Sequence, residues 1–296
     1  MLVYVHRHMH PSTLSARPVL DAVVGTASQR TLFEYVHDDA LLSLSFVLNI
    51  ALAGLTILAI VVLARGLTDP RARLITVSVL LISVVSISSY TGLTSGLTLS
   101  IVEMPPGHPA AGRTTAGEAG VLIMWGRYLT WTFSTPFILI ALGLIAGSDW
   151  TKILTSVALT IAMCLTGLAA ALTTSALFLR WWWYALSSTF FLVIVYILLV
   201  EWSAEADLTG TADIFDTLKL LTVVGWFGYP VLWALGVEGF VVLDVVVTSW
   251  GYSALDVITK YVVTMLIMLY LADEPSEIAG GPEWGRSTRA IVATDD

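Results

Sequence analysis

The sequence predicts an all-α protein, a bundle of seven transmembrane helices, and two observations indicate this class. Of the 296 residues, 57% are hydrophobic and only 12% are charged, whereas a soluble domain carries about 25% charged residues. The apolar residues also gather into runs near or above the roughly 20 residues that a helix needs to cross a bilayer. We therefore expect a multi-pass protein of the plasma membrane, with the lipid bilayer as its surroundings.

Seven apolar runs follow one another along the chain, and each is long enough for one crossing. The expected spans cover residues 41–63, 74–102, 121–147, 153–172, 176–200, 218–236 and 245–271. A helix satisfies its backbone hydrogen bonds within the span, so helices packed side by side suit a lipid surrounding. The longer connections are residues 103–120, which contain a Pro-Pro-Gly sequence, and the acidic stretch 201–216.

The segments outside the spans are short. Residues 1–40 are expected to form an extracellular segment, with a short surface helix within residues 19–35. Residues 41–272 are the expected membrane domain, and residues 273–296 an acidic cytoplasmic tail. The net charge of −8 argues against nucleic acid as a partner.

The orientation follows from the Lys and Arg residues of the short connections, because cytoplasmic loops carry an excess of them. One side has more of these residues than the other: Arg65, Arg71, Arg73, Lys152 and Lys219, against Arg113 and Arg180. We therefore expect the N-terminus outside the cell and the C-terminus inside.

The seventh span carries two opposite charges, Asp256 and Lys260. A lysine in mid-span costs about 2.5–3.5 kcal/mol or more on insertion, so it indicates a function. The four-residue spacing puts both side chains on one helix face. One interpretation is a buried ion pair that only joins helices. The other is a desolvated amine that forms a Schiff base, with the carboxylate as its counter-ion.

The third span carries a polar stripe formed by Arg127, Thr130, Ser134 and Ala141. Their spacings of three, four and seven residues place them along one helix face. Arg127 could instead extend to the membrane surface. The two hydroxyls could also serve only helix packing or bond back to helix carbonyls.

A charge count favours an anion beside this stripe. A protonated Schiff base on Lys260 and Arg127 contribute +1 each, and Asp256 contributes −1, so the sum is +1. A net charge in a low-dielectric interior is unfavourable. A halide that binds to Thr130 and Ser134 and is attracted by both cations would neutralise it.

Aromatic residues inside the spans indicate a ligand. Trp131 and Trp226 lie too deep to be interface anchors. With Tyr184 and Tyr229 they can wall a flat, elongated apolar molecule. Two glycines are expected to leave room for it, and a proline to kink the sixth span as a hinge: Gly167, Gly228 and Pro230.

These residues resemble the microbial (type I) rhodopsins, and among them the halorhodopsins, the light-driven chloride pumps of haloarchaea. Lys260 matches the retinal-binding lysine, Asp256 the counter-ion and Arg127 the arginine of the third helix. Thr130, Ser134 and Ala141 match the chloride-pump pattern, whereas a proton pump has Asp at the first and last of these positions. The resemblance implies a retinal pocket and an anion path from these residues: Trp131, Met163, Gly167, Tyr184, Ser187, Trp226, Tyr229 and Trp233 for retinal, and Arg127, Thr130, Ser134 and Thr222 for the anion.

The function that the resemblance implies is a light-driven inward chloride pump, a transporter and not an enzyme. All-trans retinal, bound to Lys260 as a protonated Schiff base, would isomerise to 13-cis, and the chain would form a homotrimer. One alternative is a sensory photoreceptor that signals through a transducer, which the fold does not exclude. Another is an outward proton pump, but Thr130 and Ala141 provide neither a proton acceptor nor a donor.

Overall fold

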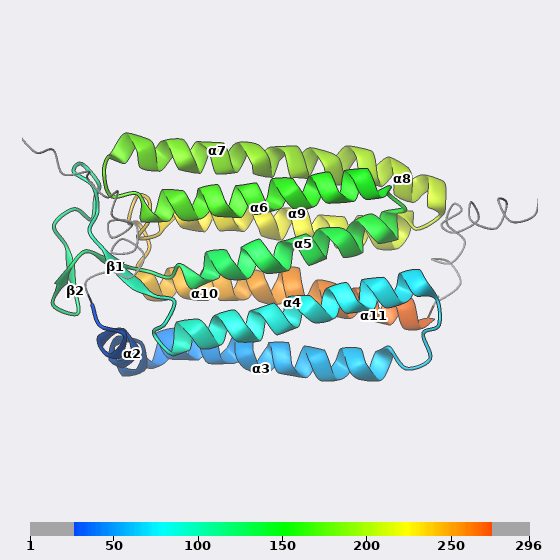
Figure 1. Ribbon diagram of the computed structural model, residues 1–296, viewed down its shortest axis with the longest axis horizontal. Coiled ribbons are helices and arrows are strands. Elements are labelled where there is room, and N and C mark those ends of the chain that lie inside the picture. The colour runs from blue at the N-terminus through cyan, green and yellow to red at the C-terminus, as the bar shows by residue number, and fades with distance from the viewer. Residues whose placement is uncertain (1–26, 274–296) are drawn as a thin grey trace, which may run out of the picture.

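Seven long helices lie side by side along the longest axis of the computed structural model, which describes residues 27–273 (Figure 1). All seven are long and apolar enough to cross a membrane: Ala40–Leu63 (α3), Pro70–Thr94 (α4), Gly126–Ala146 (α5), Trp150–Leu172 (α6), Leu177–Thr209 (α7, η1 and α8), Ala212–Leu235 (α9) and Val245–Asp273 (α10, η2 and α11). The expected segment and tail at residues 1–26 and 274–296 lie outside the described residues.

The two ends of the bundle differ. At one end lie the short helix α2 (Gln29–Asp38) and the strands, and we call this the strand end (Figure 1). At the other lies α8 (Trp202–Thr209), and we call this the α8 end. A short helix is therefore present near the expected place, but α2 runs from Gln29 to Asp38 and so ends three residues beyond the expected range of 19–35. Its side chains Leu32 and Val36 are buried, so α2 covers the bundle rather than extending from it.

Aspartates begin four of the long helices. Asp39, Asp69, Asp149 and Asp244 each accept hydrogen bonds from backbone N–H groups of the first turn, at α3, α4, α6 and α10. A side-chain oxygen at this position satisfies donors that have no partner within the helix. These four acids therefore mark helix starts and take no part in the interior site.

The connection between α4 and α5 corrects two expected boundaries. Residues 95–102 and 121–125 were expected to be helical, but β1 (Ser100–Val102) pairs antiparallel with β4 (Val121–Ile123). A second pair joins β2 (Thr114–Thr115) and β3 (Glu118–Ala119). All residues of β1 and β4 are buried, and a short buried apolar run cannot be assigned to helix or strand from its sequence.

The acidic connection 201–216 is also helical, contrary to expectation. The fifth span continues through a π-helical turn, η1 (Ile197–Glu201), into α8, and α9 begins at Ala212. Gly210 ends α8 in the left-handed conformation, with φ of 79°, which glycine adopts at low cost. The helices extend beyond the apolar runs, so hydropathy located only their lipid-facing parts.

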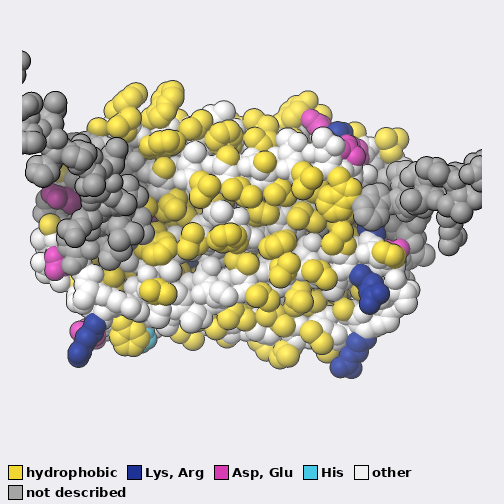
Figure 2. Space-filling view, viewed as in Figure 1, with side chains coloured by type: hydrophobic (Ala, Val, Ile, Leu, Met, Phe, Trp, Pro, Cys, Tyr) yellow, Lys and Arg dark blue, Asp and Glu magenta, His cyan; other side chains and the backbone are white. Residues whose placement is uncertain are grey.

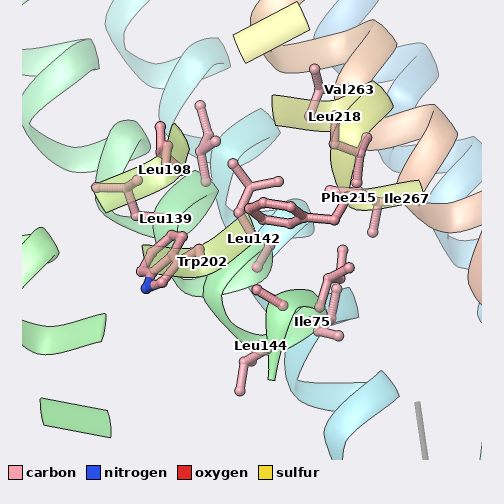
Figure 3. Packing of buried hydrophobic residues seen from close by; sticks show 14 of the residues in the cluster. Ile75, Leu139, Leu142, Leu144, Leu198, Trp202, Phe215, Leu218, Val263 and Ile267 are labelled. Atoms are coloured by element: carbon pink, nitrogen blue, oxygen red, sulfur yellow. The ribbon is translucent and has the colours of Figure 1, made fainter. Parts of the chain in front are cut away.

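Helix α5 is the centre of the bundle. Of the 18 most apolar consecutive residues of α5, 72% are buried, compared with 28–50% for the corresponding stretches of the other spans. A core between the helices fills the α8 end, and Figure 3 shows Leu142 of α5 close to Phe215, with Trp202 of α8 beside Leu139. A side chain at Gly143 would contact the Trp202 ring at 3.1 Å. On the face shown in Figure 2, hydrophobic side chains cover much of the middle, and charged side chains lie toward the two ends.

Candidate functional site

The buried pair at the centre of the site is Asp256 and Lys260, each with 1% of its surface exposed. Lys260 Nζ lies 2.9 Å from Asp256 Oδ2, and among residues 27–273 no other carboxylate forms an ion pair with this amine. Lys260 lies in the π-helical turn η2 (Val257–Val262), a local widening that is frequent at functional sites. A lysine inside an apolar bundle costs free energy, so its position indicates a function rather than packing alone.

Two tyrosines from other helices hold the Asp256 carboxylate. Tyr90 Oη of α4 donates to Oδ2 and Tyr229 Oη of α9 donates to Oδ1, both at 2.6 Å. Hydrogen bonds to an ionised acceptor are short and strong. Asp256 is thus arranged as a fixed negative charge beside the Lys260 amine.

Arg127 lies inside the bundle with only 2% of its surface exposed. Its Nη2 donates to Ser249 Oγ at 2.7 Å and to the Ser249 carbonyl at 3.2 Å, and its Nη1 donates to Tyr90 Oη at 3.2 Å. The guanidinium also lies 5.3 to 5.6 Å from the centroids of three rings, those of Phe46, Tyr90 and Tyr252. Between residues 27 and 273 no carboxylate forms an ion pair with Arg127. The guanidinium is therefore buried and not neutralised by a direct partner.

The other members of the stripe are all buried on α5. Thr130 Oγ1 donates to the Gly126 carbonyl at 3.0 Å, which is the back-bonding alternative to a ligand contact. Ser134 Oγ is buried and has no partner among the described residues, and the same holds for Thr222 Oγ1 of α9. Ser134 therefore has the free hydroxyl of the stripe, while the Thr130 proton is engaged by the helix.

The residues expected around a flat ligand line one cavity together with Lys260. They come from four helices: Trp131, Met163, Gly167, Tyr184, Ser187, Trp226, Tyr229 and Trp233. The Trp131 and Tyr229 rings meet edge to face at 5.1 Å, and the Tyr184 and Trp233 rings stack at 4.7 Å. An aromatic cavity that is largely apolar and is bordered by the Lys260 amine suits an elongated apolar ligand.

The two glycines expected to leave room have different roles. Gly167 lines the cavity, and a Cβ there would lie 3.4 Å from Ser187 Oγ. Gly228 does not line it, because a Cβ there would meet Leu255 Cδ1 of the seventh span at 2.7 Å. The expectation for Gly228 was wrong, since this glycine allows two helices to approach. Pro230 does line the cavity, and its carbonyl accepts from Tyr184 Oη at 3.1 Å.

The charge count omitted Glu238, which lies between α9 and α10 at the strand end and is buried. Its Oε1 accepts from Tyr128 Oη at 2.8 Å, and its carbonyl accepts from Arg180 Nε at 2.8 Å. Burial raises the pKa of the Glu238 carboxyl, whereas the Tyr128 hydrogen bond and then the Arg180 and Arg127 charges lower it. Burial also lowers the pKa of the His108 imidazole beside it.

The position of Glu238 at the end of an apolar run was the only sequence signal for this group. Several residues that line the aromatic cavity were also missed, because their spacing is that of ordinary helix packing: Tyr128, Thr135, Ile138, Cys164, Ser188, Phe191, Tyr252 and Thr259.

Comparison with known proteins identifies the relatives of this chain. The family of bacteriorhodopsin-like proteins matches residues 40–274. The halorhodopsin of Natronomonas pharaonis is 58% identical over 270 residues, 89% of this chain and 93% of that one. A solved structure described as halorhodopsin, a light-driven chloride pump, is 51% identical, with a TM-score of 0.77 over 81% of this chain and 99% of that one.

The same fold also carries another transport function. A solved light-driven proton pump from Coccomyxa subellipsoidea is 25% identical, with a TM-score of 0.68 over 77% of this chain and 95% of that one. The fold therefore does not identify the transported ion, and the interior residues must do so. By its family match and its identity to these relatives, the chain belongs to the bacteriorhodopsin-like family, on its halorhodopsin branch.

Proposed function

We propose that this protein is a light-driven inward chloride pump that carries retinal on Lys260. The observation that supports this most is the surplus of buried positive charge. Asp256 is the ion-pair partner of Lys260 alone, and Arg127 has no ion-pair partner in residues 27–273. An uncompensated buried charge is strongly unfavourable, so a small anion at Arg127 is the expected complement.

The residues present fit retinal. The Lys260 amine is buried beside its counter-charge Asp256, and it borders the aromatic cavity. Trp131, Tyr229 and Trp226 all line the cavity, and Gly167 lines it without a side chain. When bound, retinal supplies the absorption of light and the change from all-trans to 13-cis. The protein then has to hold the charges and guide the ion.

The interior hydroxyls suit an anion and not a proton. Ser134 offers a free O–H donor. Thr130 stands where a proton pump needs an acid, but its neutral hydroxyl is too weak a base to accept a transported proton. Ala141 provides no proton donor further along α5. We propose that chloride rests near Arg127 and Ser134.

The exit path is expected to run toward the α8 end. Thr222 has a buried hydroxyl without a partner in the described chain, one helical turn before Trp226 on α9. Beyond it the core around Phe215 and Leu142 closes the α8 end (Figure 3). This core has to open during transport, and Pro230 on α9 is the proposed hinge.

The topology is part of the proposal. The connection from α3 to α4 carries Arg65, and the first turn of α4 carries Arg71 and Arg73. This α8 end is therefore proposed to face the cytoplasm and the strand end the outside. Chloride would then enter past Arg127 and move inward. The homotrimer that the resemblance implies is likewise proposed, and the mass of the detergent-solubilised complex tests it.

Two measurements test the function. The retinal-reconstituted protein should change its visible absorption when sulfate replaces chloride, because the halide completes the counter-ion. Illuminated cells should take up protons passively, and a protonophore should enhance this uptake. An absorption that ignores chloride would contradict the anion site. Light-driven acidification that a protonophore abolishes would indicate a proton pump, and no ion movement at all would favour a sensory photoreceptor.

A further inference from the structure

Arg127 is held in place by a chain of serines that joins α10 to α3. Its Nη2 lies 2.7 Å from Ser249 Oγ, and Ser249 Oγ lies 2.7 Å from Ser45 Oγ. Ser45 Oγ in turn lies 2.7 Å from the Leu42 carbonyl. Both serines are completely buried, so water does not compete for these bonds.

The direction of every proton in this chain follows from its ends. A carbonyl can only accept, so Ser45 donates its single hydroxyl proton to Leu42. Ser45 must then accept from Ser249, whose only hydroxyl proton is thereby used. Ser249 Oγ is left with its lone pairs toward Arg127, whose guanidinium can only donate. The hydrogen-bond chain from Arg127 through Ser249 and Ser45 to Leu42 thus presents an acceptor oxygen to the positive charge of Arg127. Each hydrogen bond in such a chain polarises and strengthens the others.

Tyr90 limits the approach of Arg127 to Asp256 from the other side. Its hydroxyl proton goes to Asp256 Oδ2 at 2.6 Å, so its oxygen accepts from Arg127 Nη1 at 3.2 Å. One hydroxyl therefore separates the guanidinium from the carboxylate. Arg127 and Asp256 do not pair directly, although both are buried in the same region.

We propose that Ser249 is a positioning residue for the anion site. Its hydroxyl, oriented by Ser45, holds Arg127 away from Asp256, so that the positive charge is free for chloride. Without this acceptor, Arg127 gains by turning toward a carboxylate, and a paired arginine attracts an anion more weakly. This inference rests on the proposed chloride transport and adds to it the residue that keeps the arginine available.

The test compares Ser249→Ala with Ser253→Ala. Ser253 lies one turn further along α10, is equally buried, and donates to the Ser45 carbonyl at 3.0 Å, but it has no bond to Arg127. Both variants remove one hydroxyl from the same contact between α10 and α3. The midpoint of the chloride-dependent absorption change is measured for each reconstituted protein. We expect S249A to weaken chloride binding about tenfold, as for a lost hydrogen bond to a charged group, and S253A to stay within about twofold of the wild type.

Two further variants make the result specific. Ser249→Thr restores the hydroxyl and should recover most of the affinity. Ser45→Ala leaves the Ser249 hydroxyl free to rotate, and should weaken binding by less than S249A. If S249A does not form pigment, S45A against S253A provides the comparison. If the wild type responds to chloride but S249A has the same chloride midpoint as S253A, the positioning role of Ser249 is overturned and the proposed function is not. A wild type without any chloride response would overturn the proposed function and this inference together.

Discussion

Replacing Arg127 with glutamine tests the charge surplus directly. The change removes the buried positive charge and keeps a side chain that can donate hydrogen bonds. Two unit charges about 5 Å apart interact by about 3 kcal/mol at an effective dielectric constant of about 20. That energy corresponds to a change of about a hundredfold in affinity. We therefore expect the chloride midpoint of Arg127→Gln to rise by about that factor.

The assay is the same absorption titration in the reconstituted protein, with sodium sulfate to hold the ionic strength constant. Arg113→Gln is the matched control, because it removes the same charge at the strand end from an exposed side chain. Salt screens an exposed charge, so its effect on a distant anion site is weak. The chloride midpoint of Arg113→Gln should therefore stay near that of the wild type. Equal shifts in both variants would refute the local role of Arg127, and would indicate a general surface potential instead.

Three other changes test separate parts of the site. Thr130→Asp brings the charge sum to zero, so it should weaken chloride binding and introduce light-driven proton release, measured as the sign of the pH change in illuminated vesicles. Gly167→Leu should block pigment formation because Gly167 lines the aromatic cavity and a leucine side chain would occupy it. Gly54→Leu is the control, because nothing lies within 4 Å of a Cβ added there, and it should form pigment normally. Equal pigment yields from the two variants would contradict the assignment of Gly167 to the cavity. Glu238→Gln should flatten the dependence of thermal stability on pH. The folded protein raises the pKa of Glu238 above its ordinary value of 4.5, so it holds that proton more tightly than the unfolded chain, and wild-type stability should fall as pH rises through this window. Equal slopes of thermal stability against pH in the wild type and in Glu238→Gln would rule out this carboxyl as the source of the pH dependence.

Much of the site was accessible from the sequence because its members lie on single helices. The four-residue spacing of Asp256 and Lys260 and the spacing of Arg127, Thr130 and Ser134 depend only on helix periodicity. The structure places each group as those spacings require, buried and facing the interior. Helical spacing is local geometry, so it does not depend on how the neighbouring helices pack.

The helix ends were less accessible. The strands at 100–102 and 121–123 are as apolar as the spans that they adjoin, and α8 is too polar to be recognised as part of a span. Hydropathy reports which residues avoid water, and it does not report which backbone pattern they adopt. Gly228 shows the same limit at one residue, since only packing reveals whether a glycine faces a ligand or another helix.

The sequence by itself determined the seven spans, the lysine with its carboxylate one turn away, and the absence of an acid at Thr130. Only the tertiary structure decided which partners the charges have. Tyr90 reaches Asp256 across 166 residues of sequence, and Ser249 reaches Arg127 across 122. Seven apolar helices can pack in many rotations, and sequence spacing does not select among them. Close packing of side chains selects one, and that choice leaves Arg127 buried beside hydroxyls instead of a carboxylate.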